Sequence, residues 1–328
     1  MAAAPVAHVG WRTEHPLLAF VARRTVRLVV AMGVLLVLSF AMIHLIPGDP
    51  VRAALGPRAP LSLVVERRHQ LWLDRPIPTQ FAHYVHGVFT GDLGTSFVSN
   101  LPVSEIIAER LPNSARLAGV AFLVIMGLAV PLGIVAAILT WGRRRRGVEL
   151  AFTTATGFFA IVPEFLLGVA LVYLFSVRFR WFPVAGQSGP ASYVLPVTAL
   201  SVGSVAALAR IVRVETVKVL GEDYIRTARS KRLPARLVYL RHALPNMLTA
   251  TLTIGGLLLA GLIGGDVLVE NVFAWPGLGT TVVQSVVQQD YALAQAVILM
   301  LGAVVLIVNF AVDLLLGVLD PRSTIRRT

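Results

Sequence analysis

Apolar residues are distributed along the chain in six long runs separated by polar segments. The runs cover about residues 28–46, 117–141, 150–176, 193–212, 247–268 and 292–318. A helix needs about 20 apolar residues to cross a bilayer, and these runs are apolar on every side, unlike helices in the core of a soluble protein. Since backbone groups in lipid must be satisfied within the segment, the pattern predicts an all-α polytopic membrane protein with six transmembrane helices.

The polar segment at about 47–116 is too long for a simple connection. Two Gly- and Pro-rich clusters, PGDP at 47–50 and GDLGTSF at 91–97, enclose the stretch LWLDRPIPTQFAHYVHGVF. Phe81, Val85 and Val88 follow helical spacing there. We therefore predict short amphipathic helices that cap the outer mouth of the protein; the alternative, a flexible linker, agrees less well with the aromatic content.

The polar segment at about 213–246 is basic and is interrupted by proline. Residues 221–230 are predicted to form a short helix, Pro234 suits the first turn of a second helix ending at Leu244, and Pro245 starts the next span. Such helices could bind anionic lipid, worth about 1 kcal/mol per basic residue, or dock onto a cytosolic protein. Composition alone does not separate these two roles.

Composition agrees with a membrane protein: 56% of residues are hydrophobic and only 14% are charged, compared with about 25% charged in soluble domains. The net charge of +12 suggests nucleic acid at first. However, Lys and Arg concentrate in the short segments 143–146 and 210–241, as the positive-inside rule requires. We therefore predict that both termini are cytoplasmic and that nucleic acid is not a partner. Cysteine is absent, which excludes disulfides and thiolate metal sites, and we expect no metal site.

The basic segment resembles the cytoplasmic EAA loop of ABC importer permeases, whose pattern is EAA-x3-G-x9-I-x-LP. RTA at 226–228 stands at the EAA place, Arg232 at the Gly, and HALP at 242–245 at I-x-LP. The spacing is kept, but the Glu, the Gly and the Ile are replaced. The stretch DYIRTAR is similar to the loop of the peptide-importing branch.

Other motifs extend the resemblance from about Phe20 to Arg322. In chain order they are IPGDP, LxLDRPIPTQF, GDLGTSF, PVSEII..RLPNSARLA, WFPVAG, LPVTAL, ARIVR, VLVENVFAWPGLG, QQDY and LDPR. Together they resemble the dipeptide, oligopeptide and nickel permease class of the bacterial inner membrane, which implies a type I ABC importer permease fold. The predicted organisation is a tail at 1–27, a permease domain at 28–322 with a coupling loop at 213–246, and a tail at 323–328.

The resemblance also implies partners. These are a second permease, related but different, two cytosolic ATPases that bind ATP and Mg, and an extracytoplasmic binding protein that delivers substrate. The chain itself would bind no cofactor, in agreement with its lack of a GxxxxGK[ST] phosphate loop. The coupling loop would transmit ATPase closure to the spans beside it, as alternating access requires.

Within this loop the resemblance suggests two groups of residues. One group would pack in an ATPase groove, and the other would form ion pairs at its rim. The groove residues are Tyr224, Thr227, Ala228, Leu233 and Leu244, and the rim residues are Glu222, Asp223, Arg226 and Arg229. Arg232 stands at the Gly position of the pattern and Pro245 at its final Pro. Because Arg replaces Gly at position 232, the sequence does not determine the conformation of the turn there.

Glu164 lies midway along the third apolar run. A carboxylate at such depth costs about 2.5–3.5 kcal/mol on insertion scales, so it should face protein or a wet pathway. It either contacts a cationic group in transit, such as a peptide N-terminus, or makes a structural hydrogen bond to a helix opened by Pro163. Both interpretations remain open at this point.

Small residues recur on the fifth run, and charged residues lie near the ends of the fourth and sixth. Gly256, Ala260 and Gly264 repeat every four residues, which allows close helix packing. The stripe serves internal packing or forms the seam with a partner permease, and we predict that it shares a role at the central translocation pathway. Asp313 lies at a depth similar to that of Arg210 and Arg213, about 9 Å from the end of its span, and we predict a structural ion pair between them.

Other functional classes fit less well. An intramembrane enzyme would need a motif such as H-E-x-x-H or G-x-S-x-G, and neither is present. A passive channel or a receptor that only signals would not need the coupling loop. The sequence does not name the substrate: dipeptides, oligopeptides, glutathione and chelated nickel all occur in this permease class.

Overall fold

The computed structural model describes residues 16–45, 50–56, 58–70, 72–143, 145–265 and 267–319. The predicted tail at 323–328, part of the tail at 1–27 and most of PGDP lie outside these residues. The described part is helical and contains no β-strand. Five helices are long and apolar enough to cross a membrane, namely α1 (Pro16–Leu45), α5 (Val103–Thr140), α8 (Ala191–Leu220), α11 (Leu244–Gly265) and α14 (Tyr291–Leu319).

The sixth candidate span is bent. It consists of α6 (Arg146–Ile161), α7 (Glu164–Leu171) and the π-helical turn η2 (Val172–Arg178), with a bend of 88° after α6. Pro163 causes the break, because its ring restricts Val162 to an extended conformation, with ψ of 119°. Counting the bent pair as one span confirms six spans, and the bend at Pro163 is a feature that the apolar run did not predict.

Several helices extend beyond the apolar runs that predicted them. Helix α1 includes residues 16–27, which were assigned to the tail, and α5 begins at Val103 rather than at about 117. Helix α8 continues to Leu220. The reason is that hydropathy finds the part of a helix that lies in lipid, whereas helical hydrogen bonding continues into polar sequence until a turn or a proline stops it.

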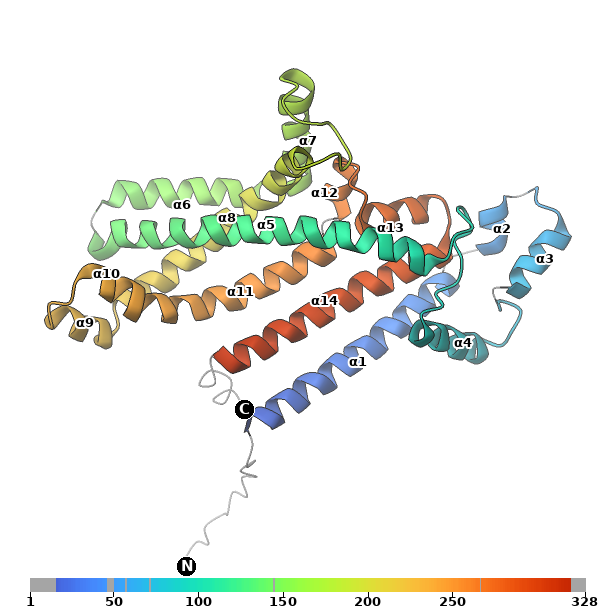
Figure 1. The fold of residues 1–328 in the computed structure, drawn as a ribbon, viewed down its shortest axis with the longest axis horizontal. Helices are drawn as coiled ribbons and strands as arrows, with labels where there is room; N and C mark the ends of the chain where they lie inside the picture. The colour runs from blue at the N-terminus through green and yellow to red at the C-terminus, as the bar shows by residue number, and fades with distance from the viewer. Residues whose placement is uncertain are drawn as a thin grey trace, which may run out of the picture.

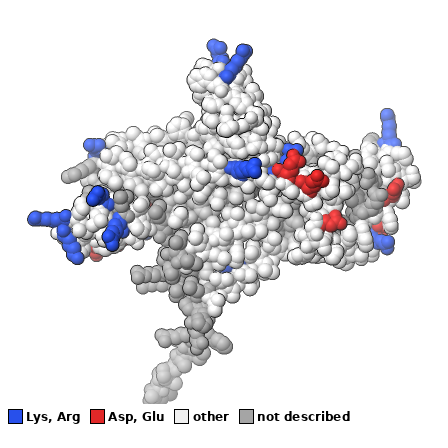
Figure 2. All heavy atoms as spheres, viewed as in Figure 1, with Lys and Arg blue, Asp and Glu red and all other residues white. Residues whose placement is uncertain are grey.

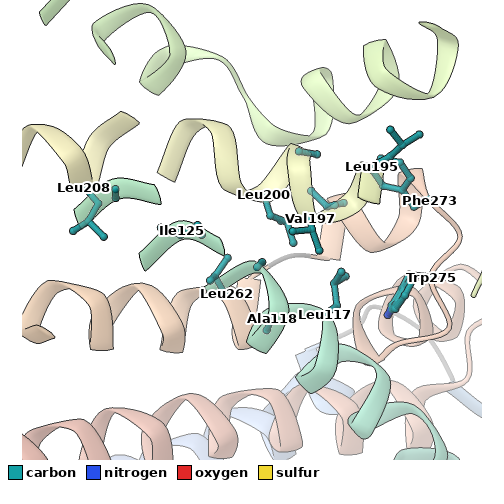
Figure 3. Close-up of a cluster of buried hydrophobic side chains, with 14 of the residues drawn as sticks. Leu117, Ala118, Ile125, Leu195, Val197, Leu200, Leu208, Leu262, Phe273 and Trp275 are labelled. Atoms are coloured by element: carbon teal, nitrogen blue, oxygen red, sulfur yellow. The ribbon is translucent and has the colours of Figure 1, made fainter. Parts of the chain in front are cut away.

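The centre of the molecule is the packing of α5 along α8. Gly133 of α5 is essential for this contact, because a Cβ there would lie 2.6 Å from both the Ala209 carbonyl oxygen and the Val212 Cβ. Figure 3 shows the core around this contact, to which α5, α8, α11 and the 267–275 segment contribute. Leu117, Ile125, Leu200 and Trp275 are almost completely buried in it.

Helices α1 and α14 lie side by side, and α11 packs against α14 (Figure 1). The small-residue stripe of α11 forms the contact between α11 and α14. A Cβ on Gly256 would collide with Val312, and a Cβ on Gly264 would collide with Val305. Ala260 is also buried. The stripe therefore packs within the chain against α14, and a role at the translocation pathway stays a prediction.

The two ends of the bundle differ (Figure 1). The cap end carries α2 (Pro50–Leu55), α3 (Leu61–Gln70) and α4 (Ile77–Thr90), together with α12 (Val267–Val272) and α13 (Leu278–Val287). The predicted amphipathic helices are thus present. They are fastened to α1, since Phe81 of α4 contacts the Phe40 ring at 5.2 Å and Gln80 bonds His44 at 3.1 Å.

The opposite end, which we call the coupling end, carries the turn η1 (Trp141–Arg143), α9 (Asp223–Ser230), α10 (Ala235–Leu237) and the π-helical turn η3 (Val238–Ala243). In Figure 2, Lys and Arg side chains gather at this end, around α9 and α10, whereas the middle of the visible face is mostly uncharged. This is the distribution expected when the middle lies in lipid and the ends lie in water.

Candidate functional site: the coupling loop

Helix α9 is amphipathic and lies against the chain's own coupling end. Its inward residues Ile225 and Ala228 are 0% and 6% exposed. They belong to a cluster that we call the coupling cluster, which also contains Val219, Leu220, Val238, Ala243 and Met247. This cluster joins the end of α8, η3 and the start of α11. Helix α9 packs on α8 and on η3, and η3 leads directly into α11, so α9 is attached to both spans through the cluster.

The outward face of α9 is polar and exposed. Tyr224 is 41% exposed, and partial burial, followed by the charge of Glu222, raises the pKa of its phenol. Asp223 and Arg226 form an exposed ion pair at 3.6 Å, and Thr227 is exposed. The Arg229 guanidinium lies 5.7 Å from the centre of the Trp141 ring, which ties α9 to the end of α5.

The structure separates the residues that were predicted to pack in an ATPase groove. Tyr224 and Thr227 face outward, but Ala228 is buried in the coupling cluster, and Leu233 and Leu244 pack against it. Ala228 therefore cannot pack in a groove of a partner, so the prediction was wrong for this residue. Leu233 and Leu244 remain partly exposed, and for them the groove contact stays a prediction.

Arg232 explains why the loop pattern has Gly at this place. Its φ is 53°, in the left-handed region. Its N–H donates to the Arg229 carbonyl at 2.9 Å, and the Leu233 N–H donates to the Ala228 carbonyl at 3.4 Å. This is a Schellman motif that ends α9, with Leu233 and Ala228 in apolar contact across it. The turn geometry expected of Gly is therefore kept, with Arg in a conformation that costs about 1–2 kcal/mol.

The second part of the loop is continuous with the fifth span. Instead of a separate helix ending at Leu244, α10, η3 and α11 follow one another without a break. The π-helical turn lies directly before Pro245, whose ring is incompatible with regular helical bonding to the preceding turn. The proline therefore changes the helix locally rather than starting a new one.

Glu164 lies at the break between α6 and α7 rather than midway along a straight helix. It is partly buried, and the Ser204 hydroxyl of α8 donates to its Oε1 at 3.5 Å. Beside it, Gly203 of α8 faces the Phe159 carbonyl oxygen. The structural contact that sequence reasoning proposed for Glu164 is thus present, although long.

The predicted ion pair between Asp313 and Arg210 or Arg213 was wrong. Asp313 of α14 pairs with Arg24 of α1 at 2.6 Å, and Arg213 of α8 pairs with Glu149 of α6 at 2.7 Å. Equal depth along two spans does not make them neighbours: α14 packs on α1 and α11, whereas α8 packs on α5 and α6. Arg24 was assigned to the tail, so its pairing was not considered.

Sequence reasoning missed a buried carboxylate at the cap end. Glu270 is 4% exposed and accepts hydrogen bonds from the Ser114 hydroxyl at 2.5 Å, the Gly279 N–H at 2.8 Å and the Thr280 N–H at 3.2 Å. Burial raises its pKa, and these donors oppose the rise. We call these four residues the Glu270 hub. The available signal was the single acidic residue in VLVENVFAWPGLG, which lies in α12 and accepts hydrogen bonds from N–H groups in the first turn of α13.

With this geometry established, the chain was compared with known proteins. Residues 129–325 match the family described as binding-protein-dependent transport system inner membrane component. Residues 17–118 match the N-terminal part of the same kind of transport component. The chain belongs to this family. It is therefore a permease of an ABC importer, a multi-pass protein of the inner membrane.

Individual relatives agree with this assignment. The chain is 39% identical over 310 residues to the glutathione transport system permease protein GsiC of Salmonella typhimurium strain LT2, covering 93% of this chain and 98% of that one. It is 38% identical over 307 residues to GsiC of Escherichia coli K12, with the same coverage, 93% and 98%.

A solved structure shows the same fold. It is the inward-facing MetNI methionine ABC transporter, with a TM-score of 0.56 and 18% sequence identity, covering 65% of this chain and 96% of that one. Permeases of this kind work with a partner permease, with ATPases and with a binding protein, and they are not enzymes themselves.

Proposed function

We propose that this chain forms one half of the translocation pathway of an ATP-driven importer for small peptides, and that α9 is its docking element for an ATPase. The observation that carries the proposal is the two-sided construction of α9. Its inward face is anchored to α8 and α11 through Ile225 and Ala228. Its outward face presents Tyr224, Arg226 and Thr227 to solvent at the basic end of the bundle.

This construction suits force transmission. A partner that holds the outward face moves the coupling cluster with it, and therefore moves the ends of two spans together. Docking on anionic lipid explains the basic charge equally well, but it does not require the exposed Tyr224 beside the acidic residues Glu222 and Asp223. Two ATPases with bound ATP and Mg would supply the motion.

A second permease chain is the proposed cover for the bent span. Helix α6 has no fully buried residue, and Phe158 and Ile161 beside the bend are 65% and 82% exposed. Non-helical backbone at membrane depth is tolerated where it is buried in protein or lines a cavity. A related but different permease, as is usual for this class by resemblance, would cover this surface, and a binding protein would deliver substrate to the cap end.

The docking assignment is tested with Tyr224→Glu, which adds a charge on the outward face and leaves the coupling cluster intact. We expect loss of co-purification with the ATPases and loss of uptake, with normal expression. Tyr224→Phe, which keeps the ring on the same face and adds no charge, is the matched control. Undiminished co-purification and uptake in Tyr224→Glu contradict the docking role.

The substrate is tested by reconstituting the permease pair with its ATPases and binding protein in liposomes. Because the relatives named above transport glutathione, we expect ATP-dependent accumulation of glutathione or of a dipeptide. Accumulation of the same size without ATP contradicts the proposal. Competition between glutathione and dipeptides separates the two substrates.

A further inference from the structure

Three helices meet in a small polar cluster at the coupling end. Arg213 of α8 donates through Nη2 to Glu149 Oε1 at 2.7 Å, and through Nη2 and Nε to the Thr140 hydroxyl at 3.0 and 3.3 Å. The Thr140 hydroxyl in turn donates to the Ala136 carbonyl at 2.8 Å. We call Arg213, Glu149 and Thr140 the coupling-end triad; it joins the end of α5, the first turn of α6 and the last third of α8.

The ion pair of the triad is well shielded from solvent, although it lies at the end of the helical bundle. The Arg213 side chain is only 16% exposed and that of Glu149 is 39% exposed. Arg presents several N–H donors in a fixed plane, so one guanidinium can bind two helices at once, which Lys cannot do with the same geometry. Solvent therefore screens this contact less than it screens the exposed pair of α9.

Arg213 of the triad lies on α8, near the end of that helix from which the chain continues into α9. Arg213 is about two helical turns before the end of α8 at Leu220, and Leu220 belongs to the coupling cluster that holds Ile225 and Ala228. Trp141, the residue after Thr140, carries the Arg229 contact. A displacement of α9 is therefore delivered first to the ends of α8 and α5, where the triad lies.

Helix α6 is the element that the triad attaches to α8 by charge, through Arg213 and Glu149. It also packs along α8, and Phe152 packs against the central core, but none of its residues is fully buried. At its other end the bend leads to Glu164, which the Ser204 hydroxyl of α8 contacts. Helix α6 thus connects the coupling end with the bend, and α5 and α8 are already locked together at Gly133.

We propose that Arg213 is a positioning residue for transport: through Glu149 and Thr140 it makes α6 follow α8 and α5 when the coupling loop moves. This inference rests on the proposed function. Without the guanidinium, ATPase closure still moves α8, but α6 and the bend lag behind it. The expected defect is therefore in the coupling between ATP hydrolysis and uptake rather than in folding or ATPase docking.

The test compares Arg213→Gln and Arg213→Lys in the complete transporter in liposomes. Arg210→Gln is the matched control, since Arg210 is exposed on the same helix, one turn away. The readout is substrate taken up per ATP hydrolysed, measured together with the melting temperature and with ATPase co-purification. We expect Arg213→Gln to lower this ratio about three- to tenfold, within the range of coupling changes seen for such networks, with ATPase co-purification kept. Arg213→Lys should lie between the two.

Glu149→Gln is the second variant, and it keeps the proposal testable if Arg213→Gln fails to fold. It leaves the Thr140 contact in place, so we expect a smaller loss of coupling in the same direction. An unchanged uptake-to-ATP ratio in both Arg213→Gln and Glu149→Gln overturns the inference, as does an equal loss in Arg210→Gln. These outcomes differ from failure of the proposed function, which appears in the unmodified transporter as uptake that does not depend on ATP.

Discussion

The coupling loop and the segment of α12 and α13 that contains most of the Glu270 hub both lie between long spans, yet they are stabilised in opposite ways. The coupling loop rests on a small apolar cluster around Ile225 and Ala228, and its polar groups face outward. In the hub a buried carboxylate bonds donors from two distant parts of the chain, α5 and α13. The first arrangement leaves a surface free for a partner. The second uses its polar groups internally and fixes one geometry.

The glycines of the two regions show the same difference. At the hub, a Cβ on Gly279 would lie 2.8 Å from Glu270 Oε2 and from the Val267 Cα, so no larger residue fits. At the coupling loop the position that favours Gly is occupied by Arg232, whose side chain is exposed. At the hub, atomic contacts leave no room for a side chain larger than that of Gly279. At position 232 of the loop there is room for a side chain, and only the left-handed backbone conformation disfavours residues other than Gly.

The largest expected effect is at the hub. Glu270→Ala leaves the Gly279 and Thr280 N–H groups and the Ser114 hydroxyl without their acceptor, so we expect a loss of about 3 kcal/mol in stability, measured as a lower melting temperature in detergent. Asn271→Ala is the control, because the Asn271 side chain donates to the Val267 carbonyl within its own helix. Equal melting temperatures for the two variants would show that the hub is not a stabilising centre.

A smaller effect is expected from a charge in the coupling cluster. Ala228→Asp buries a carboxylate at a position that is 6% exposed, at a cost of about 2 kcal/mol. Because α9 can detach without unfolding the bundle, the measurement is trypsin cleavage at the basic residues of the loop. Thr227→Asp, on the exposed face, is the matched control. If both variants are cleaved at the same rate, α9 is not anchored through Ala228.

Arg232 gives the third prediction. Arg232→Gly removes the strain of the left-handed backbone, and we expect the loop to gain about 1 kcal/mol. Arg232→Val places a β-branched residue there, and we expect a loss of about 1 kcal/mol or more. Hydrogen exchange of the amides of α9 measures both. Slower exchange in Arg232→Val than in Arg232→Gly would contradict the Schellman motif.

The smallest effect concerns the contact between Arg229 and Trp141. Arg229→Gln removes a cation–π interaction worth about 0.5 kcal/mol at an exposed site, so amide exchange in α9 should rise only slightly. Arg226→Gln, whose ion pair with Asp223 is fully exposed, should change exchange even less. If amide exchange in α9 rose more in Arg226→Gln than in Arg229→Gln, the contact of Arg229 with Trp141 would not be the stronger of the two interactions.

The spans were predictable because lipid requires long apolar runs, and five of the six were located as single helices. The bend after α6 was not, since Pro163 stands in an otherwise uniform apolar run and proline sometimes only kinks a helix. The location of α9 was predicted from its spacing pattern. The inward direction of Ala228 and the partners of Asp313 and Arg213 depend on which helices pack together, and hydropathy carries no information about helix neighbours.

The contact at Gly133 limits how the molecule can move. A Cβ at this position would collide with the Ala209 carbonyl oxygen and with Val212, so α5 and α8 pack with their backbones close together and resist sliding past each other. Any change of shape in the chain has to be absorbed at irregular backbone instead. The described chain offers such backbone at the bend after α6 and at the π-helical turns η2 and η3. We therefore expect few segments of the chain to move independently, with the changes in backbone conformation confined to the bend after α6 and to η2 and η3.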